Sequence, residues 1–185
     1  PCAKFVEILN IKDAEKFIEE NNFPIVVKSD GLAAGKGVTI RNNRKDVLND
    51  VEEIISGKFN TSKRVILEEF LDGEELSYFV ISDEKNYLQI GTAQDHKKIG
   101  ENDTGPNTGG MGAYSPSYLL NEELENKIEN KIIKPTLNGM KELGCSYKGI
   151  LYAGLMIKNN EPKLIEYNIR FGDPECQVLM MRLKN

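Results

Sequence analysis

The sequence is poor in cysteine and has no long apolar run. Its three cysteines, Cys2, Cys145 and Cys176, lie far apart and form no CxxC pair. That number and spacing indicate free thiols in a reducing compartment, more suited to structural burial than to catalysis. No apolar run approaches the roughly 18 residues needed to span a membrane, and no signal peptide is visible. We therefore expect a cytoplasmic protein with no membrane partner.

The sequence also lacks a large excess of one charge sign. Its net charge is −5 over 185 residues, and acidic and basic residues are interspersed. We therefore expect no nucleic-acid partner, and any phosphate-binding site must be local. With 39% hydrophobic residues, the chain can bury the core of one domain or of two small lobes. The single histidine, His96, indicates on its own a surface or structural residue rather than one with a proton-transfer role.

Apolar periodicity predicts a mixture of helices and strands. Helices are expected over residues 13–22, 45–55, 121–143 and 174–183, with an interruption of the third at Pro135. Strands are expected over residues 25–28, 38–40, 64–71, 75–82, 87–93, 149–157 and 163–170. The last two strands should form a hairpin across Asn159 and Asn160. A boundary between two lobes is expected near residues 69–73.

A glycine-rich segment, KSDGLAAGKG, separates the first two predicted strands. Its small residues let the backbone approach a ligand closely, and Lys28 and Lys36 place positive charge at both ends, which suits phosphate. A Walker P-loop is excluded because only three residues separate Gly31 from Gly35, and Gly37 follows the lysine. A Rossmann turn is excluded because no third glycine and no helix follow. The segment predicts a flap over a nucleotide, with a plain hairpin as the alternative.

A second polar pattern lies in the segment LIEYNIRFGDPE. Strand alternation places Glu166, Asn168 and Arg170 on one face, and Ile165 and Tyr167 on the other. A carboxylate and an amide oxygen two residues apart suit magnesium, which takes few protein ligands. The guanidinium of Arg170 could hold a phosphoryl group or a substrate carboxylate. The alternative is a solvated strand face with an ion pair between Glu166 and Arg170.

Residues 94–116, QDHKKIGENDTGPNTGGMGAYSP, show no regular pattern. A loop of this length inside a compact chain is usually functional or disordered. Its charged and polar residues are chemically varied rather than low in complexity, which favours substrate binding over disorder.

These segments together resemble the ATP-grasp domain of the phosphoribosylamine–glycine ligase family, also called glycinamide ribonucleotide synthetases. The resemblance runs through PIVVKSDGLAAGKG, VILEEFLDGEELSYFV, the loop of residues 94–116, GILYAGLMI and IEYNIRFGDPE, which is nearly the whole chain. The TGPNTGGMG text is specific to this family, whereas the flap and the ExN pair recur across ATP-grasp ligases. This sequence reads NDTGPN where many relatives read DDTGPN, and it has Ile169 and Cys176 where Cys and Thr are frequent. Neither difference touches a predicted ligand.

The resemblance implies an α+β ATP-grasp fold of two α/β lobes, whose largely antiparallel sheets enclose the nucleotide. Residues 1–70 would form the small lobe with the flap, and residues 71–185 the larger lobe with the magnesium and substrate residues. The N-terminal and C-terminal domains of the full enzyme would be absent from this sequence. We therefore expect little or no ligase activity from the chain by itself.

The resemblance also implies residue roles. Lys28 would contact the adenine edge and the α-phosphate, and the flap would cover the β- and γ-phosphates with Gly31, Leu32, Ala33, Ala34, Gly35, Lys36 and Gly37. The adenine and ribose contacts would come from Glu68, Glu69, Phe70, Leu71 and Glu75. The magnesium ligands would be Glu166 and Asn168, and the catalytic residues Lys28 and Arg170. Glycine and phosphoribosylamine would contact Asp95, Lys97, Asn107, Gly109, Gly110, Met111, Gly112, Arg170, Asp173 and Glu175.

The activity implied by the resemblance joins glycine to 5-phosphoribosylamine through glycyl phosphate, in purine biosynthesis. It would consume ATP and use Mg²⁺, or Mn²⁺ in its place, and the missing domains of the same enzyme would be its protein partners. Two alternatives stay open, namely another ATP-grasp carboxylate–amine ligase, and a nucleotide-binding module that is inactive as a fragment.

Overall fold

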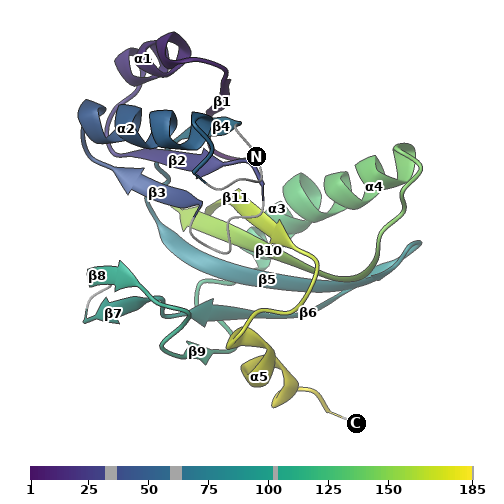
Figure 1. The fold of residues 1–185 in the computed structure, drawn as a ribbon. Coiled ribbons are helices and arrows are strands. Elements are labelled where there is room, and N and C mark those ends of the chain that lie inside the picture. The colour runs from purple at the N-terminus through teal and green to yellow at the C-terminus, as the bar shows by residue number, and fades with distance from the viewer. Residues whose placement is uncertain (32–36, 59–63, 102–103, 185) are drawn as a thin grey trace. The chain divides into compact units, whose positions relative to one another are not determined.

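The computed structural model describes residues 1–31, 37–58, 64–101 and 104–184 (Figure 1). The chain divides into a small unit, Ala3–Leu71, and a large unit, which combines Pro1–Cys2 with Asp72–Asn185. Within the described residues, no helix combines the length and the apolar character needed to cross a membrane.

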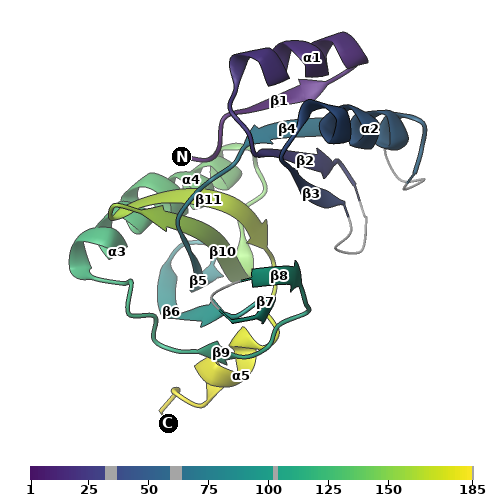
Figure 2. The same ribbon diagram turned by 90° about the vertical axis from the view of Figure 1, so that its left-hand side faces the viewer.

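The small unit is a four-stranded antiparallel sheet with two helices on one face (Figure 2). Its elements are β1 (Phe5–Ile8), α1 (Ile11–Glu20), β2 (Ile25–Ser29), β3 (Val38–Arg41), α2 (Arg44–Ile55) and β4 (Val65–Glu69), and the strand order is β1-β4-β2-β3. Both helices begin with an asparagine cap, since Asn10 and Asn43 each accept a hydrogen bond from the backbone N–H three residues later. Their apolar stripes pack on the sheet and form one core. The predicted helices are confirmed, whereas the sequence pattern did not reveal β1.

The large unit is built on a five-stranded antiparallel sheet of order β11-β10-β5-β6-β9. These strands are β5 (Glu74–Asp83), β6 (Tyr87–Asp95), β9 (Ala113–Tyr114), β10 (Lys148–Lys158) and β11 (Glu161–Asn168). The short strands β7 (Lys98–Gly100) and β8 (Thr104–Asn107) pair with each other. The expectation that residues 94–116 lack regular structure is therefore wrong, because short strand pairs form there without an apolar alternation to mark them.

Helices cover both faces of this sheet. On one face, α3 (Glu122–Ile128), a π-helical turn (Glu129–Ile133) and α4 (Lys134–Glu142) follow one another without a break, while α5 (Glu175–Met180) lies on the other. The predicted interruption at Pro135 is wrong in position, since the irregular turn precedes it. Pro135 lies in the first turn of α4, where its missing N–H is tolerated.

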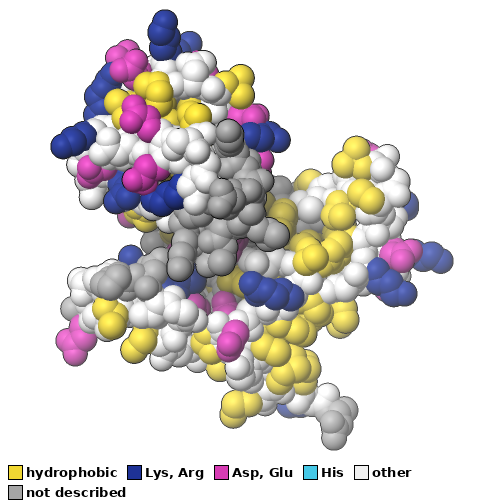
Figure 3. Space-filling model, in the orientation of Figure 1, with side chains coloured by type: hydrophobic (Ala, Val, Ile, Leu, Met, Phe, Trp, Pro, Cys, Tyr) yellow, Lys and Arg dark blue, Asp and Glu magenta, His cyan; other side chains and the backbone are white. Residues whose placement is uncertain are grey.

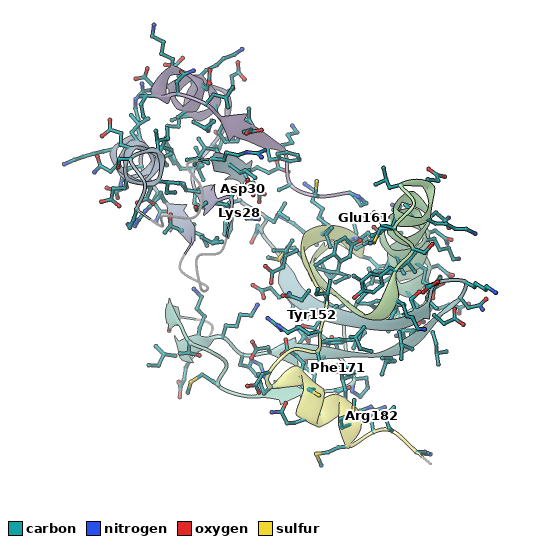
Figure 4. All side chains as sticks on the ribbon, turned by 45° about the vertical axis from the view of Figure 1, so that its right-hand side comes forward. Lys28, Asp30, Tyr152, Glu161, Phe171 and Arg182 are labelled. Carbon is teal, nitrogen blue, oxygen red and sulfur yellow. The ribbon has the colours of Figure 1, made fainter. Side chains whose placement is uncertain are left out.

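Alternation along β5 and β10 separates the two faces of the large sheet. Leu76 and Tyr78 belong to the core under α3 and α4, whereas Phe79 and Tyr152 pack with Phe171 near α5 (Figure 4). On α5 itself, Glu175 and Leu179 are buried, while Met180 at its end and Met181 directly after it are exposed, and Figure 3 shows hydrophobic side chains on this part of the surface. The face that carries α5 is also the face that carries the candidate site.

The three cysteines are free. Cys2 and Cys145 are exposed, and Cys176 is partly buried. The expected burial is therefore wrong for the first two, because Cys2 lies beside the edge strand β11 and Cys145 follows the end of α4.

Candidate functional site

A pocket opens on the α5 side of the large sheet. Its polar lining consists of Glu75, Ser77, Lys97, Tyr152 and Glu166. Glu75 and Ser77 come from β5, Tyr152 from β10 and Glu166 from β11, while Lys97 follows the end of β6. Three residues with predicted ligand roles, Glu75, Lys97 and Glu166, thus line one pocket.

Lys97 is the cation of this pocket. Its ammonium lies 2.6 Å from a carboxylate oxygen of Glu75. Burial acts to lower the pKa of Lys97, but the negative charge and hydrogen bond of Glu75 outweigh burial and raise it. Asp95 and Glu166 act in the same direction. Lys97 therefore remains charged at neutral pH and can attract an anionic ligand.

Glu166 and Asn168 lie on the same side of β11. The Asn168 amide nitrogen donates to a Glu166 carboxylate oxygen at 3.1 Å. A 180° turn of the amide would present its oxygen beside the carboxylate instead, giving two hard oxygen donors of the kind that magnesium prefers. Among the described residues, no group of three or more His, Cys, Asp or Glu forms a metal cluster. Magnesium, which takes few protein ligands and fills its shell with water and phosphate oxygens, fits such a pair of donors.

A β-bulge changes the predicted faces of β11. Gly154 pairs with Glu166 and Leu155 with Leu164, so one extra residue lies on β11 between these pairs. As a result, Leu164 and Tyr167 pack against the same core although they are three residues apart. Ile165 lines the pocket with Glu166. The prediction that Ile165 and Tyr167 share the opposite face is therefore wrong.

Arg170 lies beyond the end of β11 and is exposed. Its guanidinium donates to the carbonyl oxygen of Phe171 at 2.9 Å, and within the described residues it makes no ion pair with Glu166. The alternative of an ion-paired strand face is thus not what the structure shows. The guanidinium keeps donors for a phosphoryl group or a carboxylate, as predicted for it.

Beneath the pocket lies a hydroxyl–carboxylate cluster formed by Ser77, Tyr152 and Glu175, which are at most 7% exposed. One oxygen of Glu175 accepts a hydrogen bond from Tyr152 at 3.0 Å and from Ser77 at 3.3 Å. Burial raises the pKa of Tyr152, so its hydroxyl stays protonated and donates. Ser77 and Tyr152 were not among the residues predicted from the sequence, although each is a polar residue in a mostly apolar strand.

Asp95 lies against the loop of residues 108–112, because a Cβ atom built on Gly110 would be 3.1 Å from its Oδ1 atom. Burial raises the pKa of Asp95, and the charge of Glu175 adds to the effect. Its Oδ1 atom is buried without a hydrogen-bond partner. The loop is held by backbone bonds from Met111 to His96 and from Thr108 to Lys97, each 2.7 Å long. The predicted substrate residues Gly109, Gly110, Met111 and Gly112 lie in this loop, and Asn107 at the end of β8 precedes it.

The predicted nucleotide residues of the small unit gather on β2 and β4. The Lys28 ammonium lies 2.7 Å from a carboxylate oxygen of Glu68. At the end of β4, Glu69 accepts a bond from the backbone N–H of Lys4, and Phe70 is 39% exposed. In the flap, Gly31 is exposed and the carbonyl of Gly37 accepts from the Ser29 N–H. Leu32, Ala33, Ala34, Gly35 and Lys36 lie outside the described residues.

Leu71 and Asp173 also have predicted ligand roles. Leu71, the last residue of the small unit, is partly buried. Asp173 is exposed in the turn before α5, where its carboxylate accepts a hydrogen bond from the side chain of Gln177 at 2.8 Å.

Comparison with solved structures defines the class of fold. The biotin carboxylase domain of the Hydrogenobacter thermophilus 2-oxoglutarate carboxylase superposes with a TM-score of 0.75 at 19% identity, covering 98% of this chain and 38% of that one. A phosphoribosylamine–glycine ligase from Thermotoga maritima superposes with a TM-score of 0.89 at 34% identity, covering 97% and 46%. The fold is an α+β ATP-grasp fold, which confirms the expectation from the sequence.

The sequence comparisons define the family within that class. The family model described as the phosphoribosylglycinamide synthetase ATP-grasp (A) domain matches residues 1–176. A phosphoribosylamine–glycine ligase from Brucella melitensis is 50% identical over all of this chain and 44% of its own length. The chain belongs to the phosphoribosylglycinamide synthetase ATP-grasp domain family, and it spans less than half the length of this relative.

Proposed function

We propose that this chain is the ATP-grasp part of a longer phosphoribosylamine–glycine ligase. In this proposal the enzyme joins glycine to 5-phosphoribosylamine, with ATP converted to ADP and phosphate, in the purine biosynthesis of the cytoplasm. Family membership over residues 1–176 supports the proposal. One observation connects this proposal with particular residues, namely that Glu75, Lys97 and Glu166 line the same pocket.

The reaction would proceed by attack of the glycine carboxylate on the γ-phosphate, which gives glycyl phosphate. The amine of phosphoribosylamine then attacks the acyl carbon, and phosphate leaves. A carboxylate that attacks a phosphate needs cancellation of negative charge more than it needs a base. In this chain Lys28 and Arg170 are the cations proposed for that role, and Lys97 supplies the positive charge of the pocket.

Glu166 and Asn168 are the proposed ligands of a divalent cation, magnesium or manganese. The cation would neutralise phosphate charge when bound. The support for this assignment is the donor set itself, because a carboxylate and an amide lie within 3.1 Å of each other. Glu75 and the segment Glu68 to Leu71 are proposed to bind the ribose and the adenine, and the flap to cover the phosphates.

The partners follow from the lengths of the relatives. Because the Brucella relative is more than twice as long as the part that matches, we propose that further domains of the same protein complete the substrate pocket. The fragment by itself would then bind nucleotide and show little turnover.

The test is glycine-dependent release of ADP by the full-length protein, measured with and without 5-phosphoribosylamine. Release that requires both glycine and the amine supports the proposal. Release that requires a different carboxylate would indicate another ATP-grasp carboxylate–amine ligase. Binding of ATP by calorimetry, with no release for any carboxylate, would indicate a nucleotide-binding module and would contradict the proposal.

A further inference from the structure

Glu175 is the most buried of the described residues with a predicted substrate role. The residue is 3% exposed, and one carboxylate oxygen faces two hydroxyl groups from the sheet. Those hydroxyl oxygens, on Ser77 and Tyr152, are themselves 2.9 Å apart. The two hydroxyl groups have only two protons for the three contacts among Ser77, Tyr152 and Glu175. Glu175 is therefore hydrogen-bonded by neutral donors, which belong to β5 and β10.

The same carboxylate packs against the turn that precedes α5. A side chain at Gly172 would collide with the Glu175 carboxylate, so the two lie in direct contact. The turn is closed by a bond from the Cys176 N–H to the Gly172 carbonyl at 3.0 Å. The turn is therefore attached to the sheet through Glu175, at one end of α5.

Pro174, in this turn, meets the predicted substrate loop. A Cβ atom built on Gly110 would lie 2.8 Å from the Pro174 ring and 3.1 Å from the unpartnered Oδ1 of Asp95. The backbone of Gly110 therefore packs directly on the turn. A continuous chain of contacts leads from Tyr152 through Glu175 and Pro174 to the loop.

We propose that Glu175 is a positioning residue, which with Ser77 and Tyr152 fixes the turn of residues 172–174 and through it the substrate loop of residues 108–112. Glu175 then acts on glycine or phosphoribosylamine through the loop and does not contact either substrate. The inference rests on the proposed function for the identity of the substrates, but its structural part does not.

The chemistry of the cluster favours this role. A buried carboxylate that binds a cationic substrate group would have to exchange its partners whenever the ligand leaves. Glu175 already has hydroxyl donors, and these come from strands in the centre of the sheet. Hydrogen bonds between rigid strands and a helix end are suited to holding a loop in one position.

The test compares Glu175→Ala, Glu175→Gln and Tyr152→Phe in the full-length protein. Glutamine keeps a side-chain oxygen that accepts from both hydroxyls but removes the charge, so it separates positioning from charge recognition. Tyr147→Phe is the matched control, because that hydroxyl bonds the Ile150 carbonyl and its ring packs against the opposite core. The measurements are KM for each substrate, kcat, and amide hydrogen exchange of residues 108–112.

We expect Tyr152→Phe, which loses one hydrogen bond to Glu175, to raise KM for glycine or phosphoribosylamine about fivefold, and Glu175→Ala, which loses two, to raise it by about fivefold or more, with KM for ATP unchanged. Both variants should exchange faster in residues 108–112, while Glu175→Gln and Tyr147→Phe stay close to the wild type.

If Glu175→Gln raises KM as much as Glu175→Ala does, the charge contacts substrate and the proposal is wrong. Unchanged exchange in Glu175→Ala would also overturn it. Absence of glycine-dependent turnover in the wild type would contradict the proposed function alone, because the exchange measurement needs no substrate.

Discussion

The Lys28 ammonium and the Glu68 carboxylate form an ion pair of 2.7 Å between neighbouring strands of the small unit. Glu68 pairs in register with Val26, so it is diagonal to Lys28 on the same face of the sheet. The two side chains are only 22% and 19% exposed. Each charge is therefore partly desolvated and is compensated by the other.

Replacement of Lys28 should weaken nucleotide binding. We expect Lys28→Met to raise the Kd for ATP about tenfold, because a charged hydrogen bond to a phosphate contributes about 1.5 kcal/mol or more. The measurement is calorimetric titration of the full-length protein with ATP. Lys45→Met is the control, since Lys45 is an exposed lysine on α2. Equal affinities of wild type and Lys28→Met would remove Lys28 from the nucleotide site.

Local sequence signals were sufficient to predict features that depend on the backbone conformation of one or two residues. Asn159 and Asn160 both have positive φ angles, 52° and 59°, and join β10 to β11 in the predicted hairpin. The bulge at Ile165 could not be predicted, because it depends on the pairing with β10 and leaves no mark in the sequence of β11. The π-helical turn before Pro135 could not be predicted either, because the helical periodicity of the sequence continues through it.

Some residues of the candidate site could likewise be predicted from the sequence, and others could not. Glu75, Lys97 and Glu166 could be selected from sequence motifs, and the structure brings them to one pocket. Ser77 and Tyr152 could not, because a serine and a tyrosine inside strands carry no motif. Their role in the site depends on the register that places β5 beside β10 and on the position of α5 over both strands.

Replacement of Glu166 should abolish metal-dependent function and leave the fold intact. Glu166 is exposed, so Glu166→Ala removes a ligand without creating a cavity. We expect loss of turnover and a reduction of about tenfold or more in calorimetric affinity for Mn²⁺ in the presence of ATP. Glu161→Gln is the control on the same strand, where the carboxylate pairs with Lys127 and Lys131 instead. Turnover retained by Glu166→Ala would contradict the assignment of Glu166 as a metal ligand.

A side chain at Gly110 should destabilise the substrate loop. Its φ of +116° is unfavourable for any other residue, and a Cβ there would lie 2.8 Å from a rigid proline ring. We expect Gly110→Ala to lower the stability of the protein by about 1 kcal/mol or more, measured as a shift in thermal unfolding. Gly109→Ala is the control for stability, since nothing lies within 4 Å of a Cβ at that position. Similar unfolding temperatures for the two variants would contradict the packing of the loop on Pro174.

The carboxylate of Asp50 on α2 should contribute to the acid sensitivity of the protein. This residue is 8% exposed and accepts two bonds from the Arg41 guanidinium, at 2.6 and 2.9 Å. Burial alone would raise the pKa of Asp50, but the hydrogen bonds from Arg41 and Thr39 outweigh it and hold the pKa below its ordinary value of 3.8. The folded state therefore binds the proton less tightly than the unfolded state does.

The sign of the pH dependence follows from that difference. The stabilisation by Asp50 is fully present above the ordinary value of 3.8, and it is lost as the pH falls through the lower pKa of the folded state. Asp50→Asn should lower stability near neutral pH by about 1 to 3 kcal/mol, because it weakens a buried charged hydrogen bond. It should also make unfolding less sensitive to acid than in the wild type, as measured by urea denaturation over a series of pH values. Glu52→Gln, an exposed change on the same helix, should keep the acid sensitivity of the wild type. If Asp50→Asn and the wild type lose stability equally on acidification, other carboxylates carry the effect and Asp50 does not.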